Sequence, residues 1–326
     1  MERREFIGLL GGVAAWPLPA RAQSSAAPVI GFLHSGSPME NAKRLDAYLK
    51  GLKEQGFVDG DNVNIEYRWA AGDNDKLAAM AAELVKRNVA LISTAGSTPA
   101  SRAAKRATSA IPMIFAIGGD PVELGLVESI SRPGGNATGI TSINASITSK
   151  RLELLQRLAP QASRYFALVN PGTPLSDVFL KDLALGAPKL GIGFEVLRAQ
   201  SEAEIDAAFA SLPPGPGNAL LSCPDAYLYT RRAQITALAM HHAVPTAFDV
   251  RDYIDIGGLL SYGADFLEVM RLAGNYTGRV LKGEKPADLP VVRSEKFEMD
   301  INLKTAKQLS LTVPPDLLAI ADEVID

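Results

Sequence analysis

The stretch Ala90–Gly135 reads ALISTAGSTPASRAAKRATSAIPMIFAIGGDPVELGLVESISRPGG and contains two strand-to-helix turns of one design. In each turn an apolar run ends at glycine, which a capping residue and a proline follow. In the first turn we expect Thr98 to be the N-cap and Pro99 the first helical residue; in the second, Asp120 is the expected cap. Such turns present free backbone N–H groups and the positive end of a helix dipole.

The glycine–cap–proline pattern occurs twice more, at Gly36-Ser37-Pro38 and at Gly172-Thr173-Pro174. Any one of these turns is explained by a good helix start alone. Four of them at the strand ends of parallel sheets would line one crevice, and ligands bind in such crevices. The repeated pattern therefore predicts a ligand-binding cleft.

The first 22 residues are typical of an export signal. A twin-arginine pair, Arg3-Arg4, precedes a modest apolar run, and Ala20-Arg21-Ala22 fits a cleavage site after Ala22. The apolar run, Ile7–Leu18, is too short to span a bilayer. We therefore expect a periplasmic protein from which residues 1–22 are removed.

Composition excludes some functions and narrows the fold. The net charge of −3 argues against a nucleic-acid partner, which requires a basic face. The single cysteine, Cys223, rules out an intramolecular disulfide, so the apolar core alone must stabilise the fold. At 326 residues and 47% hydrophobic, the chain is long and apolar enough for two domains.

Short apolar strands alternate with amphipathic helices in two similar halves. In the first half, Val29–His34 is an expected strand, and Leu45, Tyr48, Leu49 and Leu52 form one helix face. The second half starts with the expected strand Tyr165–Asn170 and repeats the plan. This α/β alternation predicts two Rossmann-like domains, each with a parallel sheet.

The motifs of several enzyme classes are missing from the sequence. There is no GxGxxG dinucleotide fingerprint, no GxxxxGK[ST] phosphate loop and no GxSxG nucleophile elbow. The histidines, His34, His241 and His242, do not have the spacing of metal ligands. The sequence therefore predicts a protein that is not an enzyme and has no cofactor or metal.

Segments along nearly the whole chain resemble the ABC-transporter substrate-binding family that includes the tryptophan/tyrosine-type binding proteins. They are RREFIGLLGG (Arg3–Gly12), GLKEQGFVDGDNVNIEYRWA (Gly51–Ala70), IPMIFAIGGDPVELGLV (Ile111–Val127), RPGGNATGIT (Arg132–Thr141), KRLELL (Lys150–Leu155), GGLLSYG (Gly257–Gly263), YTGRVLKGEKPADLPVV (Tyr276–Val292) and INLKTAKQLSLTVPP (Ile301–Pro315).

The resemblance implies a type I periplasmic-binding-protein fold, in which two α/β lobes joined by three hinge crossings close on a ligand. We expect the crossings near Ala137–Ile143, Gly257–Tyr262 and Leu289–Arg293. Lobe 1 would comprise residues 28–140 plus 259–288, and lobe 2 residues 141–258 plus 289–326. The expected partners are a small-molecule ligand and an ABC permease in the inner membrane, and the expected state is a monomer.

A zwitterionic amino acid, of the aromatic or branched kind, suits the polar groups at the predicted strand ends. A carboxylate would bind at the Gly96–Thr98 turn, and an ammonium group at Asp225. The full candidate set is Ser35, Gly36, Gly96, Ser97, Thr98, Gly119, Asp120, Asp225, Tyr227, Arg251 and Tyr262.

Alternatives stay open for several of these residues and for the function. Asp120 can be only a helix cap, Asp225 a surface turn residue, and Arg251 the partner of Asp249 in a salt bridge between lobes. Tyr229 can belong to the core. The sequence fits a second function as well as it fits transport: a periplasmic sensor component that presents its closed form to a membrane receptor.

Overall fold

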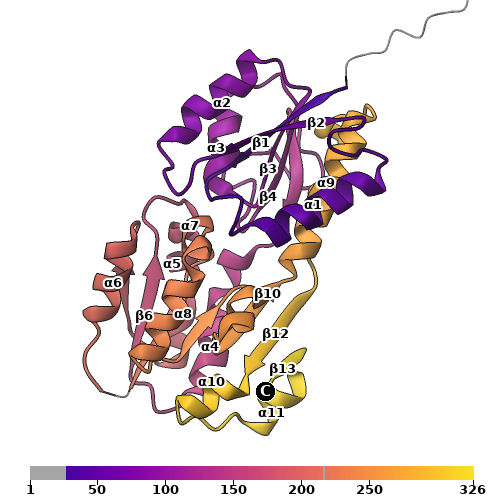
Figure 1. Ribbon diagram of the computed structural model, residues 1–326. Helices are drawn as coiled ribbons and strands as arrows, with labels where there is room; N and C mark the ends of the chain where they lie inside the picture. Colours follow the sequence, from indigo (N-terminus) through magenta and orange to yellow (C-terminus); the bar gives the residue numbers. More distant parts are fainter. Residues whose placement is uncertain (1–26, 216) are drawn as a thin grey trace, which may run out of the picture.

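The computed structural model describes residues 27–215 and 217–326, and the predicted export signal lies outside the described residues. The chain forms two α/β lobes, one above the other in Figure 1. The first lobe contains β1 (Val29–His34), α1 (Ala42–Glu54), β2 (Asn64–Trp69), α2 (Lys76–Lys86), β3 (Leu91–Ala95), α3 (Thr98–Ala107), β4 (Met113–Ile117), β5 (Ala137–Thr141), α9 (Phe266–Leu281), η4 (Pro286–Asp288) and β11 (Val292–Arg293).

The first sheet is wholly parallel, with the strand order β11-β5-β4-β3-β1-β2. Alternation of side chains along each strand gives it two apolar faces. Phe32 and Ile114 lie on the face that packs against α1 and α9. Leu33 and Phe115 lie on the face that packs against α2 and α3. Both faces are therefore covered, as expected for a parallel sheet.

The second lobe has seven strands in the order β13-β12-β10-β9-β8-β6-β7, and only the β10–β12 pair is antiparallel. Its elements are η1 (Asn144–Ile147), α4 (Thr148–Leu158), β6 (Arg164–Val169), α5 (Leu175–Gly186), η2 (Ala187–Leu190), β7 (Phe194–Arg198), α6 (Glu202–Ala210), β8 (Asn218–Ser222), α7 (Ala226–Thr230), α8 (Arg232–His241), β9 (Thr246–Phe248), η3 (Arg251–Ile256), β10 (Leu260–Ala264), β12 (Phe297–Asn302), α10 (Leu303–Gln308), α11 (Pro315–Ile320) and β13 (Glu323–Ile325).

The chain passes between the two sheets three times: after β5, between β10 and α9, and between β11 and β12. The first passage falls at the end of the expected stretch Ala137–Ile143. The other two passages come just after the expected stretches. β10 pairs with β9 and β12, so residues 260–264 belong to the second lobe. β11 pairs with β5, so residues 292–293 belong to the first lobe.

Helix α9 returns the chain to the first lobe, as the family resemblance implies. It lies directly beside α1 in Figure 1, orange against indigo. The two helices touch through glycines, because a Cβ added to Gly51 would lie 1.8 Å from the carbonyl oxygen of Arg271, and one added to Gly274 would lie 1.9 Å from that of Tyr48. This close packing fixes α9 in the first lobe although β10 and β12 on either side of it belong to the second.

The turns that decide the fold differ in detail from their predicted form. The N-cap of α3 is Ser97, whose side chain accepts a hydrogen bond from the Ala100 N–H, and Thr98 is the first helical residue. Asp120 accepts bonds from the N–H groups of Val122 and Glu123, but the chain forms only a turn there. After Gly36, helix α1 starts only at Ala42.

Candidate ligand-binding site

A cavity of about 40 Å³ lies between the two lobes, at the carboxyl ends of strands from both sheets. From the first lobe and the passage after β5 it is lined by Arg44, Gly96, Thr98, Pro99, Ala116, Ile117, Gly118, Ser142 and Asn144. From the second lobe it is lined by Thr173, Leu175, Pro224, Asp225, Ala226, Tyr229 and Asp249, and Phe266 at the start of α9 completes the lining. Three of the four glycine–cap–proline turns contribute to this lining.

The lobes touch each other around this cavity, so the structure is a closed form. Lys43 of α1 lies 3.5 Å from Asp255 of η3. The side-chain amide of Asn74 donates to the carbonyl oxygen of Gly172 at 3.2 Å. Lys181 reaches Glu123 at 3.7 Å. A cavity of this size holds only about three water molecules.

Arg44 carries positive charge from the first lobe into the cavity. It is 5% exposed, and its guanidinium carbon lies 3.2 Å from the ring centroid of Tyr229 and 4.5 Å from that of Phe266. Asp252 lies at 4.0 Å, and Tyr229 donates its hydroxyl to the same carboxylate at 2.9 Å. The Nε of Arg44 is buried and has no hydrogen-bond partner among the described residues.

The N-terminus of α3 adds a second positive element beside Arg44. Thr98 carries the first N–H of the helix, a group that has no acceptor within the helix. The loop behind it is held by Ser97, whose Oγ accepts from the Ser35 N–H at 3.2 Å and lies 2.8 Å from Ser35 Oγ. These bonds fix the ends of β3 and β1 relative to each other.

His34 supports the same corner from behind. The ring is 2% exposed, and Nδ1 accepts a hydrogen bond from the Gly36 N–H at 2.8 Å. Burial, together with the nearby charge of Arg44, lowers the pKa of His34 from 6.5 to about 3. The imidazole is therefore neutral at physiological pH, and the positive charge at this corner comes from Arg44 and the helix.

The second lobe supplies negative charge from Asp225. Its Oδ1 accepts three hydrogen bonds, from the N–H groups of Tyr227 and Leu228 at 3.0 Å and from the Asn170 amide at 2.9 Å. Asp225 is therefore the N-cap of α7 as well as a wall of the cavity. Burial raises the pKa of Asp225, while these bonds hold it down.

Asp249, at the end of β9, is a second carboxylate on the cavity wall. The side-chain amide of Asn144 donates to its backbone carbonyl at 3.3 Å and to its carboxylate at 3.4 Å. Burial raises the pKa of Asp249, and the charges of Arg151 and Arg44 lower it. The cavity therefore has positive groups on the first lobe and carboxylates on the second.

Of the predicted residues, Gly96, Thr98 and Asp225 line the cavity. Ser35, Gly36 and Ser97 lie one layer behind, within the hydrogen bonds of the turns, and Gly119 and Asp120 form the turn beside Gly118. Tyr227 packs against Gly72 of the other lobe, and Tyr262 stacks on Phe297 with ring centroids 6.1 Å apart. Neither tyrosine is among the lining residues.

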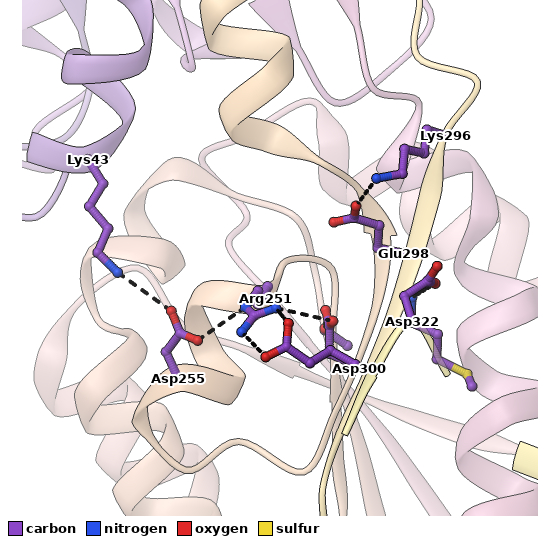
Figure 2. A network of polar contacts seen from close by, with 10 residues as sticks. Lys43, Arg251, Asp255, Lys296, Glu298, Asp300 and Asp322 are labelled. Carbon is purple, nitrogen blue, oxygen red and sulfur yellow. Dashed lines mark hydrogen bonds and ion pairs between the residues drawn. The ribbon is translucent and has the colours of Figure 1, made fainter. Parts of the chain in front are cut away.

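Arg251 lies in a different place from the predicted one. Its guanidinium contacts the carboxylates of Glu323 and Asp255. Figure 2 shows this network, which extends from Lys43 in the first lobe through Asp255 and Arg251 to the Asp300 carboxylate on β12. Arg251 lines a neighbouring, acidic cavity of about 130 Å³, which shares Asp249 and Phe266 with the cavity above.

Sequence reasoning missed Arg44, Asn144 and Phe266, and left Asp249 and Tyr229 with other roles. Arg44 sits on α1 next to Leu45, and nothing in the helical pattern separates it from a surface arginine. It reaches the cavity only because the second lobe closes over the start of α1. Phe266 opens α9 directly after the second passage between lobes, a passage that the sequence places too early.

Two negative observations concern the described parts of the chain alone. Within residues 27–215 and 217–326, no group of three or more histidine, cysteine, aspartate or glutamate side chains could hold a metal ion. In the same ranges, no helix has the length and apolar character needed to cross a membrane.

Comparison with known proteins gives the family. The model of the ABC transporter substrate binding protein family matches residues 37–325. The chain belongs to this family. The ABC transporter substrate-binding proteins are binding components of transport systems, and this chain has their type I periplasmic-binding-protein fold.

Individual family members and solved structures are similar over most of the chain. The tyrosine-binding protein of Clostridioides difficile (strain R20291) is 30% identical over 273 residues, which cover 84% of this chain and 77% of that protein. The ABC domain from Streptococcus pneumonia in complex with L-Trp has a TM-score of 0.82 and 27% identity, covering 92% and 100% of the two chains. A conserved domain protein from Vibrio cholerae O1 biovar El Tor shows the same fold, with a TM-score of 0.84, 24% identity, and coverage of 91% and 99%.

Proposed function

We propose that this substrate-binding protein captures a free α-amino acid as a zwitterion between its lobes. The observation that carries the proposal is the division of charge across the cavity. Arg44 and the start of α3 are positive on the first lobe, and Asp225 and Asp249 are negative on the second. An α-amino acid carries one charge of each sign at fixed separation, so it pairs with both lobes only when they close.

Each charged group of the ligand has a specific partner in this proposal. The carboxylate accepts hydrogen bonds from the N–H and hydroxyl of Thr98 and lies near Arg44, because helix N-termini favour anions. The ammonium group pairs with Asp225. Since three protein donors converge on Oδ1, we assign Oδ2 to the ligand, beside the hydroxyl of Thr173, which also bonds to this carboxylate.

The side chain of the ligand meets an apolar wall formed by Leu175, Pro224 and Phe266. Tyrosine and tryptophan are the first candidates, because relatives of this chain are described with these amino acids. The closed cavity of about 40 Å³ is too small for either, so the lobes open to admit the ligand and close around it less tightly. The ligand then shifts the equilibrium toward closure, since only the closed form contacts it from both sides.

The direct test of the ammonium partner is the substitution Asp225→Asn. Asparagine caps a helix as well as aspartate does, so α7 keeps its start while the charge is lost. We expect binding of the amino acid, measured by calorimetry, to weaken at least tenfold, since a buried charged hydrogen bond is worth roughly 1.5–3 kcal/mol.

The matched control is Asp120→Asn. The carboxylate of Asp120 also follows a strand end and caps a turn, but it does not line the cavity. The affinity of the Asp120→Asn variant for the amino acid should equal that of the wild type. Equal affinities for Asp225→Asn and the wild type would remove Asp225 from the binding site.

Export and delivery complete the proposed role. Residues 1–22 direct the chain to the periplasm and are cleaved after Ala22, and the monomeric mature protein delivers its ligand to an inner-membrane ABC permease. The mass of the exported protein tests the cleavage, because a mature chain that still begins at Met1 would contradict it.

A further inference from the structure

Asn144 connects two of the three passages between the lobes. It directly follows the first passage, is 1% exposed, and accepts a hydrogen bond at Oδ1 from the Ala264 N–H at 2.9 Å. Ala264 ends β10, immediately before the second passage. The side-chain nitrogen of Asn144 donates to the backbone and carboxylate oxygens of Asp249. One amide therefore joins both passages and a wall of the cavity.

The backbone around Asn144 is held in an uncommon conformation. Ile143 has φ of 50° and ψ of 18°, in the left-handed region that β-branched residues rarely adopt. Such a conformation persists only where the surroundings hold it. Here the Ile143 N–H donates to Thr141 Oγ1 at 3.2 Å, and Arg151 donates to the carbonyl oxygen of Asn144.

Space around the amide is tight. A Cβ added to Gly263 would lie 1.9 Å from the carbonyl oxygen of Asp249 and 3.0 Å from the amide nitrogen of Asn144. Behind Asn144, the side chain of Arg151 is fully buried, and its charge acts on Asp249. The hydrogen bonds leave the Asn144 amide one orientation, because the Ala264 N–H needs an acceptor and the Asp249 oxygens need a donor.

We propose that Asn144 ties the first two passages into a single hinge and transmits ligand binding to it. This inference rests on the function proposed above for its link to the ligand, because Asn144 and Asp249 both line the cavity. A ligand that contacts either residue biases the setting of both passages at once. Asn144 is a positioning residue in this role, and it acts through Ala264 and Asp249.

The variant Asn144→Asp tests the link, since it keeps the shape but replaces the donor with a second carboxylate next to Asp249. The charged groups facing this point are Asp249, Arg151 and Arg44. At pH 7.5 we expect the radius of gyration of the ligand-free variant, measured by X-ray scattering, to exceed that of the wild type. We expect ligand affinity to fall about tenfold. At pH 5 a proton shared with Asp249 supplies a donor again, so both differences from the wild type should shrink.

The matched control is Asn170→Asp, which places a carboxylate next to Asp225 in the same way but touches no passage between lobes. It should weaken ligand binding while leaving the ligand-free radius of gyration unchanged. Thermal unfolding confirms that both variants are folded, and Asn144→Ala replaces the aspartate variant if that variant does not fold.

The inference is overturned if the ligand-free radius of gyration of the Asn144 variants equals that of the wild type at both pH values. It is also overturned if Asn144→Asp and Asn170→Asp change that radius equally. Because lobe separation is measured without ligand, these outcomes do not depend on whether an amino acid binds. Failure of the proposed function would instead appear as a wild type that binds no amino acid.

Discussion

His34 is a single buried residue whose protonation makes the free energy of unfolding depend on pH. Its pKa is about 3 in the folded chain and 6.5 in the unfolded chain, so the unfolded chain binds the extra proton first as pH falls. The stability from the neutral ring is complete above pH 6.5 and is lost as the pH drops toward 3, by about 1.4 kcal/mol per pH unit within that window.

The measurement is the free energy of unfolding by denaturant between pH 7.5 and 4, for the wild type and for His34→Gln. Buried carboxylates such as Asp225 and Asp249, whose pKa values are raised, contribute with the opposite sign, and the difference between the two proteins cancels them. We expect a flatter profile for His34→Gln. Parallel profiles would mean that the pKa of His34 is the same in the folded and the unfolded chain.

Single residues also show how far the sequence predicts the site. Asp225 could be found because it is an acidic residue just after a predicted strand end, and it lines the cavity. Arg44 could not be found, since its place depends on closure of a distant lobe over α1. The partners of Arg251, Asp300 and Glu323, could not be found, because they lie on C-terminal strands whose position no local pattern gives.

At the scale of the element, the start of α3 depends on one hydroxyl. Ser97 caps the helix and also bonds to the backbone and side chain of Ser35. Loss of the cap costs about 1 kcal/mol, and loss of the Ser35 bonds adds about 1 kcal/mol more. We therefore expect Ser97→Ala to lower the free energy of unfolding by about 2 kcal/mol in denaturant titrations.

The comparison variant is Ser201→Ala at the start of α6, where the serine accepts from the Glu204 N–H in the same way but has no second turn to hold. It should lose only about 1 kcal/mol. Equal losses for the two serines would show that the bonds between Ser97 and Ser35 add no stability.

The same helix start explains a one-residue error of prediction. Proline is tolerated throughout the first turn of a helix, so Pro99 does not decide whether Ser97 or Thr98 is the cap. Because Ser97 takes that place, Thr98 becomes the first helical residue and lines the cavity. Most helices and strands were predictable from their apolar periodicity. The first residue of a helix depends instead on which of two neighbouring polar residues, such as Ser97 and Thr98, takes the N-cap position.

At the scale of the whole molecule, the alternation of strands and helices predicts two lobes. It does not predict which strands the chain contributes to each lobe as it passes between them. Strand β10 has the same apolar character as a strand of either sheet. Its place is decided by pairing with β9 and β12. Strand β12 follows β10 only after the chain has passed through the first lobe and returned. Sequence periodicity reports burial, and it carries no information on which sheet a strand joins.

The charge division between the lobes is the central claim, and one calorimetric comparison tests it most directly. The mature protein, refolded to remove carried-over ligand, is titrated with its best amino acid, with the amide of that amino acid and with its deaminated analogue. If each lobe binds one charge, both analogues bind at least tenfold more weakly than the parent, because each leaves a buried charged group unpaired. A deaminated analogue that binds as tightly as the amino acid would contradict the account.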